Sequence, residues 1–329
     1  MFFRASNKEN NQSNTNPLEK YKILESQLSY HMRKDCIGFG TDAYVVSAKL
    51  NDKKVAVKCF YVKRETPPSP QKIFTEALAM IELQSPRVVE FIGVVDISKP
   101  ETLHSEMVES KNAVDAQPRI VMKQYKSSLM NYLKDSKNVV TTEQQLKWAT
   151  QISEAVAYIH EHGWLHNDLR ADNIFLDEND DIVLGDFGYA CRTSCTPEEI
   201  DINSRFITPE QLKCEDIQAM HSLASCSTDV YRLGTLLWQI QTRKYPFYEH
   251  SASDVESFRE SKQLHEVIPD DCPPILKDII QQCWNDDPSK RPSAKLLATR
   301  LQNEMSSLMK KIDIADNKST MDLIQKIKH

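Results

Sequence analysis

Three polar side chains in the middle of the chain have the types and the spacing that metal and proton chemistry needs. Asp168 is followed five residues later by Asn173, and Asp186 comes thirteen residues after Asn173. Carboxylate and amide oxygens are the ligands that Mg²⁺ prefers, which suits Asn173 and Asp186. A further carboxylate can orient an attacking hydroxyl and accept its proton, which suits Asp168. Each residue alone would most often be a turn residue, so their order and spacing carry the inference.

A second group of residues lies nearer the start of the chain. The sequence around Gly38 and Gly40 is a glycine loop between two predicted strands, and Lys58 ends an apolar run twenty residues after Gly38. A buried strand seldom ends in lysine unless the ammonium group has a partner. Glu76, on the next predicted helix, is the candidate partner. The alternative is a surface lysine and a solvated glutamate.

The elements that must position these residues divide the chain into a strand-rich first third and a helical remainder. Apolar residues on both sides of Asn51-Asp52 predict a hairpin over 44–57. Helical spacing predicts helices over 73–81, 142–163, 230–240, 275–284 and from Ser293 onward. Short strands are expected at 88–95, 120–122, 173–176 and 182–184.

Composition and charge exclude several classes of protein. The 329 residues include 41 Lys and Arg against 47 Asp and Glu, and this net charge of −6 gives no field for non-specific binding to nucleic acid or membranes. No apolar run approaches the roughly 18 residues of a membrane span. The eight scattered cysteines fit reduced thiols, and we expect a cytoplasmic protein.

Taken together, these motifs resemble the eukaryotic protein kinase catalytic domain, within the tyrosine kinase and tyrosine-kinase-like group. The resemblance covers about residues 29–302. The glycine loop, VAIK, HRDLxxxN, DFG and APE motifs of that family correspond here to Gly38–Ala43, Val55–Lys58, His166–Asn173, Asp186–Gly188 and Thr208–Glu210. Further landmarks lie at Asp229–Gly234 and Cys283–Pro292, and all seven glycines fall on or beside landmarks of the domain.

The resemblance implies an α+β, bilobal protein kinase fold. A small β-rich N-lobe with one key helix is expected at 29–123, a hinge at 123–127 and a larger, mostly α-helical C-lobe at 128–302. The polar residues 1–28 are expected to form a disordered tail, and 303–329 the end of the last helix and a C-terminal tail. A surface loop is expected at 96–119, where a regulatory partner could bind, as it could at the tails.

The resemblance also implies a role for each site residue. Asp168 is expected to be the catalytic base, Lys58 to hold the ATP phosphates while it pairs with Glu76, and Arg170 to complete the catalytic set. Mg²⁺, with Mn²⁺ as the alternative, is expected on Asn173 and Asp186. The residues expected to bind ATP are Ile37, Gly38, Phe39, Gly40, Ala43, Val45, Ala56, Lys58, Met122, Lys123, Tyr125 and Phe175.

Other landmark residues are expected to support the site. Glu210 would pair with Arg291, and Asp229 would lie beneath the catalytic loop. An internal spine of stacked side chains would consist of Met80, Phe91, His166 and Phe187.

Asn167 departs from the family pattern. Most kinases that are regulated through the activation segment carry arginine at this position, where it grips a phosphate on that segment. Asparagine is neutral and cannot form such a charge-assisted pair. We therefore expect activity that does not require phosphorylation of Ser194, Thr196 or Ser204.

The implied function is transfer of the γ-phosphoryl group of Mg-ATP to a protein hydroxyl in intracellular signalling. Arg170 and Asn203 stand where Ser/Thr kinases have Lys and Thr, which favours tyrosine as acceptor. The segment 204–207 lacks the proline expected of a tyrosine kinase, so Ser/Thr and dual specificity stay open. An ATP-binding pseudokinase scaffold is the alternative, and the complete set of catalytic residues argues against it.

Overall fold

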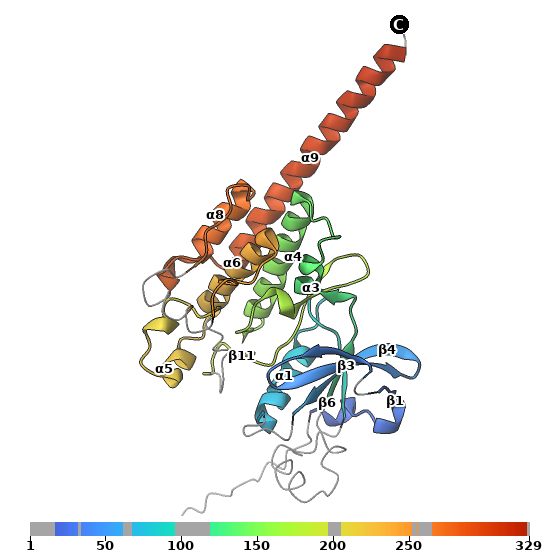
Figure 1. Ribbon diagram of the computed structural model, residues 1–329, viewed down its shortest axis with the longest axis vertical. Coiled ribbons are helices and arrows are strands. Elements are labelled where there is room, and N and C mark those ends of the chain that lie inside the picture. Colours follow the sequence, from blue (N-terminus) through green and yellow to red (C-terminus); the bar gives the residue numbers. More distant parts are fainter. Residues whose placement is uncertain are drawn as a thin grey trace, which may run out of the picture. The chain divides into compact units, whose positions relative to one another are not determined.

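The computed structural model describes residues 17–31, 34–61, 68–95, 119–196, 205–251, 255 and 265–327, with side chains as far as residue 310. The chain forms two compact units (Figure 1). The first contains residues 1–70 and 92–122, and the second contains 71–91 and 123–329. Among the described residues, no helix combines the length and the apolar composition that crossing a membrane requires.

The main element of the first unit is a β-sheet whose strand order differs from the order in sequence. Its strands are β1 (Leu28–Ser29), β2 (Cys36–Phe39), β3 (Ala43–Leu50), β4 (Lys53–Phe60), β5 (Phe91–Val95) and β6 (Arg119–Lys123). Their order is β1-β3-β4-β6-β5, and β2 pairs with β3. The antiparallel hairpin β3–β4 confirms the predicted one, and Asn51 and Asp52 have φ angles of 48° and 66°, as a type I′ turn requires. One face of the sheet forms a core with Val46, Val57 and Val121.

The first unit begins earlier than predicted. Residues 17–28, expected to belong to a disordered tail, form two 3-10 helices and the start of β1, and Leu18 is 1% exposed. The Ile23 amide donates to the Val94 carbonyl at 2.8 Å. Gly93 allows this contact, since a Cβ there would come within 2.5 Å of Ile23 Cδ1. The prediction was wrong for these residues because the buried side chains of Leu18 and Ile23 anchor the segment.

Helices dominate the second unit, as predicted. They are α1 (Pro70–Glu82), α3 (Leu129–Lys134), α4 (Thr142–Glu161), α5 (Ile217–Ser222), α6 (Cys226–Thr242), α8 (Pro274–Cys283) and α9 (Ala294–Ile327). Helix α4 packs against α6 and α9, and α6 packs against α8 (Figure 1). The hydroxyl of Thr141 caps α4, and the hydroxyl of Ser293 caps α9.

Short strands carry the loops of the candidate site. They are β7 (Ser127–Ser128), β8 (Trp164–Leu165), β9 (Ile174–Leu176), β10 (Ile182–Leu184) and β11 (Cys191–Arg192). Strand β9 pairs with β10 and β7, and β11 pairs with β8. Strands β9 and β10 confirm the two predicted there. The catalytic loop lies between β8 and β9, and the activation segment begins after β10.

Helix α1 belongs to the second unit from Gln71 onward, and the predicted lobe boundary at residue 123 stays a prediction. Glu82, its last residue, forms an ion pair with Arg192 of β11 and accepts a hydrogen bond of 3.1 Å from the Trp164 indole. Near its start, the Lys72 ammonium lies 4.1 Å from the centre of the Tyr189 ring. These contacts join residues about a hundred positions apart, which periodicity cannot predict.

Several segments with predicted roles lie outside the described residues. They include 1–16, the loop at 96–118 and residues 197–204, which contain Ser204. The side chains after residue 310 also lie outside them.

Candidate active site

Asp168 lies in the catalytic loop and is 3% exposed. The Asn173 Nδ2 donates to Asp168 Oδ2 at 2.6 Å and to its main-chain oxygen at 2.8 Å. On the other side, Arg170 Nε lies 3.3 Å from Asp168 Oδ1. The structure therefore brings together three of the predicted residues, and the hydrogen bond from Asn173 and the ion pair with Arg170 hold the carboxylate in one orientation.

Asp229 of α6 orders the backbone of the catalytic loop, as predicted. Its Oδ2 accepts from the His166 amide at 2.9 Å, and its Oδ1 accepts from the Asn167 amide at 2.9 Å. The His160 Nε2 lies 3.0 Å from the same Oδ2. Burial acts to raise the pKa of Asp229, but the hydrogen bond and charge of His160 outweigh it and the pKa lies below its usual value. An ionised carboxylate beneath the loop can accept all of these hydrogen bonds.

The pairing of His160 with Asp229 is expected to make the stability of the second unit fall above neutral pH. Burial acts to lower the pKa of His160, but hydrogen bonds to Asp229 and Cys226 outweigh it and raise the pKa to about 9. The unfolded imidazole has a pKa of about 6.5. The stabilisation is therefore fully present below about pH 6.5 and is lost as the pH rises through 9.

Thermal unfolding between pH 6 and pH 9.5 checks this expectation. The unfolding temperature of the unaltered protein should fall over this range by more than that of His160→Gln. Parallel profiles for the two proteins would contradict the assignment.

His166 connects the catalytic loop to the activation segment. Burial lowers the pKa of His166, which keeps the ring neutral. Its Nδ1 accepts from the Asp168 amide at 3.2 Å, so Nε2 carries the proton and donates to the Gly185 carbonyl at 2.9 Å. The ring centre lies 5.0 Å from that of Phe187, which confirms this part of the predicted spine. The participation of Met80 and Phe91 stays a prediction.

Asn173 and Asp186 have oxygens that suit a divalent cation. The Asn173 Nδ2 points to Asp168, so Oδ1 is the amide atom that would face a cation if one were bound. Asp186 has a φ of 57° and accepts a hydrogen bond of 3.4 Å from the Gly188 amide. A carboxylate and an amide oxygen are the hard donors that Mg²⁺ selects, so these residues fit the implied metal.

In the first unit, the glycine loop joins β2 to β3. Gly38 pairs with Val45 across the two strands, and the Gly40 amide donates to the Ala43 carbonyl at 2.8 Å to close the turn. Phe39, at the tip of this hairpin, is 82% exposed. Ile37 is also exposed. These side chains do not pack into the core of the first unit, which leaves them available to a ligand.

Lys58 lies on β4 directly opposite Val45 of β3. Its ammonium is 5.4 Å from the centre of the Phe60 ring. Ala56 and Met122 are buried. The register thus brings Lys58 and Val45 onto adjoining strands of one sheet.

In the second unit, the predicted nucleotide-binding residues are Lys123, Tyr125 and Phe175. The Lys123 amide donates to the Glu90 carbonyl at 3.0 Å. The rings of Tyr125 and Phe175 stack at 6.1 Å with an interplanar angle of 10°. Gly185 makes room for Phe175, since a Cβ there would lie 2.5 Å from Phe175 Cε2.

Glu76 lies on α1 and is 2% exposed. Its predicted pairing with Lys58 joins residues of different units and stays a prediction.

The predicted site residues do not include Glu82, Arg192 or Arg232. Glu82 and Arg192 join α1 to the activation segment. Arg232 is 1% exposed on α6. A signal for it was present, since it is the only charged residue in the predicted helix 230–240.

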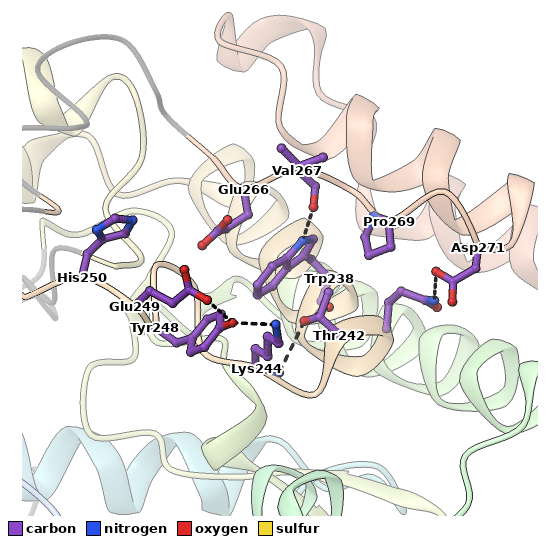
Figure 2. A pocket seen from close by; sticks show the side chains of 11 residues that line it. Trp238, Thr242, Lys244, Tyr248, Glu249, His250, Glu266, Val267, Pro269 and Asp271 are labelled. Atoms are coloured by element: carbon purple, nitrogen blue, oxygen red, sulfur yellow. Dashed lines mark hydrogen bonds between the residues drawn. The ribbon is translucent and has the colours of Figure 1, made fainter.

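A separate cavity of about 490 Å³ lies at the end of α6 (Figure 2). Trp238, Tyr248 and Glu266 are among the residues that line it. The Trp238 indole donates to the Val267 carbonyl at 2.9 Å, and Lys244 Nζ donates to Tyr248 Oη at 2.7 Å. None of the predicted catalytic or nucleotide-binding residues lines this cavity.

The family described as protein tyrosine and serine/threonine kinase matches residues 32–301. Since this match covers most of the chain, the chain belongs to that family. It is a protein kinase domain, and the family confirms the predicted α+β fold and the predicted class of phosphotransferase.

The chain is also similar to individual kinases. It is 27% identical over 282 residues to a mitogen-activated protein kinase kinase kinase 7-like protein of Drosophila melanogaster, a match that covers 82% of this chain and 65% of the relative. It is 28% identical over 291 residues to the dual specificity protein kinase pyk3 of Dictyostelium discoideum, a match that covers 88% of this chain and 19% of the relative. For the tyrosine-protein kinase ABL2 of Mus musculus, the identity is 28% over 258 residues, covering 77% and 20%. The chain thus spans less than two thirds of the length of each of these relatives.

Proposed function

We propose that this kinase domain is catalytically active and transfers the γ-phosphoryl group of ATP to a protein hydroxyl. The observation that carries the proposal is the arrangement around Asp168. Asn173 and Arg170 hold its carboxylate from two sides, and the His166 ring accepts a hydrogen bond from its amide. A general base needs a fixed orientation of this kind, because it must meet the proton of the attacking hydroxyl.

In this proposal, Asp168 accepts the proton of the acceptor hydroxyl as the oxygen attacks the γ-phosphorus. The bond from that phosphorus to the β–γ bridging oxygen breaks, and ADP leaves with the bonding electrons. Asn173 and Arg170 keep the carboxylate in position, and Lys58 binds the phosphates. When bound by Asn173 and Asp186, Mg²⁺ supplies positive charge that offsets the charge of the phosphate oxygens. Catalysis then consists mainly of positioning and charge stabilisation.

We propose tyrosine as the first acceptor to test, with serine and threonine as the alternatives. Arg170 and Asn203 favour tyrosine. The names of the three relatives include a dual specificity and a tyrosine-protein kinase, which supports testing all three hydroxyl amino acids.

Incubation of the purified chain with γ-labelled ATP, Mg²⁺ and a panel of protein substrates tests the activity, with Lys58→Met as the control. Label in the unaltered protein but not in the control is the expected result, and phosphoamino-acid analysis then identifies the acceptor. No label on any substrate would favour the signalling scaffold.

Activity is expected to survive removal of phosphate from the activation segment. Ser194 and Thr196 are exposed. Neutral Asn167 offers no charge to a phosphate on either of them. Treatment with phosphatase should change kcat by less than about twofold, as should the triple alanine variant at 194, 196 and 204. Loss of activity in both would show that a phosphate is needed.

We also propose that the chain acts in the cytoplasm. All eight cysteines are free thiols, which suits a reducing compartment. Fractionation of cells that produce the tagged chain tests this, and recovery in a secretory compartment would contradict it.

A further inference from the structure

Arg232 is a charged side chain inside the second unit. It is 1% exposed and lies on α6 among buried, mostly apolar residues. Its guanidinium donates through Nη1 to the Asn167 carbonyl and through Nε to the Phe206 carbonyl at 3.3 Å. Asn167 belongs to the catalytic loop, and Phe206 lies near the end of the activation segment, residues 186–210. Arg232 therefore connects the catalytic loop to the end of that segment.

The side chain of Asn167 reaches the start of the same segment. Its Nδ2 donates to the Tyr189 carbonyl at 3.0 Å and to Cys191 Sγ at 3.3 Å. The orientation of the amide follows from chemistry, since an oxygen placed there would face another carbonyl oxygen. Burial raises the pKa of Cys191 to about 11, so the sulfur accepts as part of a neutral thiol.

Burial of these two polar side chains costs free energy that burial of an apolar side chain would not. A buried guanidinium is costly to desolvate, and Arg232 Nη2 has no hydrogen-bond partner among the described residues. Asn167 Oδ1 is also buried without a partner there, and Asn167 has a φ of 62°. An apolar side chain would avoid these costs. Each residue donates hydrogen bonds to one end of the activation segment, Asn167 to its start and Arg232 to its end.

No phosphate is needed for any of these contacts. The acceptors are the carbonyl oxygens of Asn167, Tyr189 and Phe206 and the thiol of Cys191. They are present whatever the phosphorylation state of the segment. The exposed Ser194 and Thr196 are not among them.

We propose that Asn167 and Arg232 form a bridge that positions both ends of the activation segment and replaces a phosphate in that task. Asn167 holds the start of the segment through its amide, and Arg232 holds the end and ties it to the backbone of Asn167. Both are positioning residues rather than catalytic ones. The effect on catalysis rests on the proposed function, whereas the effect on the order of the segment does not.

Hydrogen–deuterium exchange of the phosphatase-treated full chain tests the bridge without any need for activity. Asn167→Gly removes the amide and tolerates the positive φ. Amides at 189–192 should then exchange about five- to tenfold faster, while those at 205–208 change less. In Arg232→Met, the amides at 205–208 should exchange about five- to tenfold faster, while those at 189–192 change less. Arg243→Met is the matched control, because Arg243 follows α6 and also donates to a carbonyl, that of Asn138, which is not part of the segment.

Kinetics of the same proteins test the link to catalysis. For Arg232→Met, kcat is expected to fall about 10- to 100-fold while KM for ATP stays within about twofold, because the nucleotide-binding residues are unaltered. Arg232→Lys keeps the charge but loses the fork of donors, and should recover part of the activity and part of the protection at 205–208. Arg243→Met should match the unaltered protein.

The outcomes separate the bridge from the proposed function. If exchange at 189–192 in Asn167→Gly and at 205–208 in Arg232→Lys equals that of the unaltered protein, the bridge is wrong even if the kinase is active. If both regions respond as expected but the unaltered protein transfers no phosphoryl group, the bridge holds and the proposed activity fails. Should Arg232→Met not fold, Asn167→Gly and Arg232→Lys still decide the question.

Discussion

Replacement of Asp168 by asparagine is expected to lower kcat about 10²- to 10⁴-fold, the usual range for loss of a general base. The substitution changes only one carboxylate oxygen into an amino group. It removes the acceptor of the substrate proton. It also places an amide where Asn173 Nδ2 now donates from 2.6 Å and where the Arg170 guanidinium forms an ion pair, with Nε at 3.3 Å. Binding of ATP should change little, because Asp168 is not among the residues expected to hold the nucleotide.

Steady-state kinetics of Asp168→Asn and of Asp172→Asn, with the binding of ATP measured separately, check this result. Asp172 is the matched control, since it lies in the same loop and its Oδ1 accepts from Tyr245 Oη at 2.6 Å. Asp172→Asn should retain kcat within about threefold. If Asp168→Asn retains as much activity as the control, Asp168 is not the base.

The largest effect on stability is expected at Arg291. Its side chain is fully buried, and two of its nitrogens donate to the two carboxylate oxygens of Glu210 at 2.8 and 2.6 Å. It also donates to the carbonyls of Asn285 and Ser227, and it lies 4.9 Å from the centre of the Tyr231 ring. Arg291→Met leaves the Glu210 carboxylate largely buried without its partner. Loss of one member of a buried pair costs about 3–5 kcal/mol.

That loss corresponds to a fall in the unfolding temperature of about 6–20 °C for a domain of this size. The adjacent Lys290 provides the control, because its ion pair with Asp287 is largely exposed and Lys290→Met should cost about 1 kcal/mol or less. Calorimetry of both variants distinguishes the two kinds of pair. Equal shifts in the two variants would mean that Arg291 and Glu210 contribute no more than a surface pair.

Much of the fold and of the site was predictable because its signals are local. The hairpin at 44–57 follows from alternation and from two residues that tolerate positive φ, and α4 follows from its apolar spacing. The motifs fix which side chains meet across short loops. Asp168, Arg170 and Asn173 lie within six consecutive residues, so their contact needs little more than the local turn. The pairing of Glu210 with Arg291 was predictable only from the resemblance to kinases.

The contacts that only the tertiary structure decided join residues far apart in sequence. Residues 17–28 look polar, yet Leu18 and Ile23 anchor them to a sheet whose Gly93 lies about seventy positions later. Glu82 attaches α1 to Arg192, and Arg232 connects Asn167 to Phe206. Sequence spacing describes which residues share one face of a helix or strand, but the partner of a buried charge depends on which elements pack together. The sequence alone therefore determined that the chain is a kinase domain, while packing decided which contacts the described ends of its activation segment make.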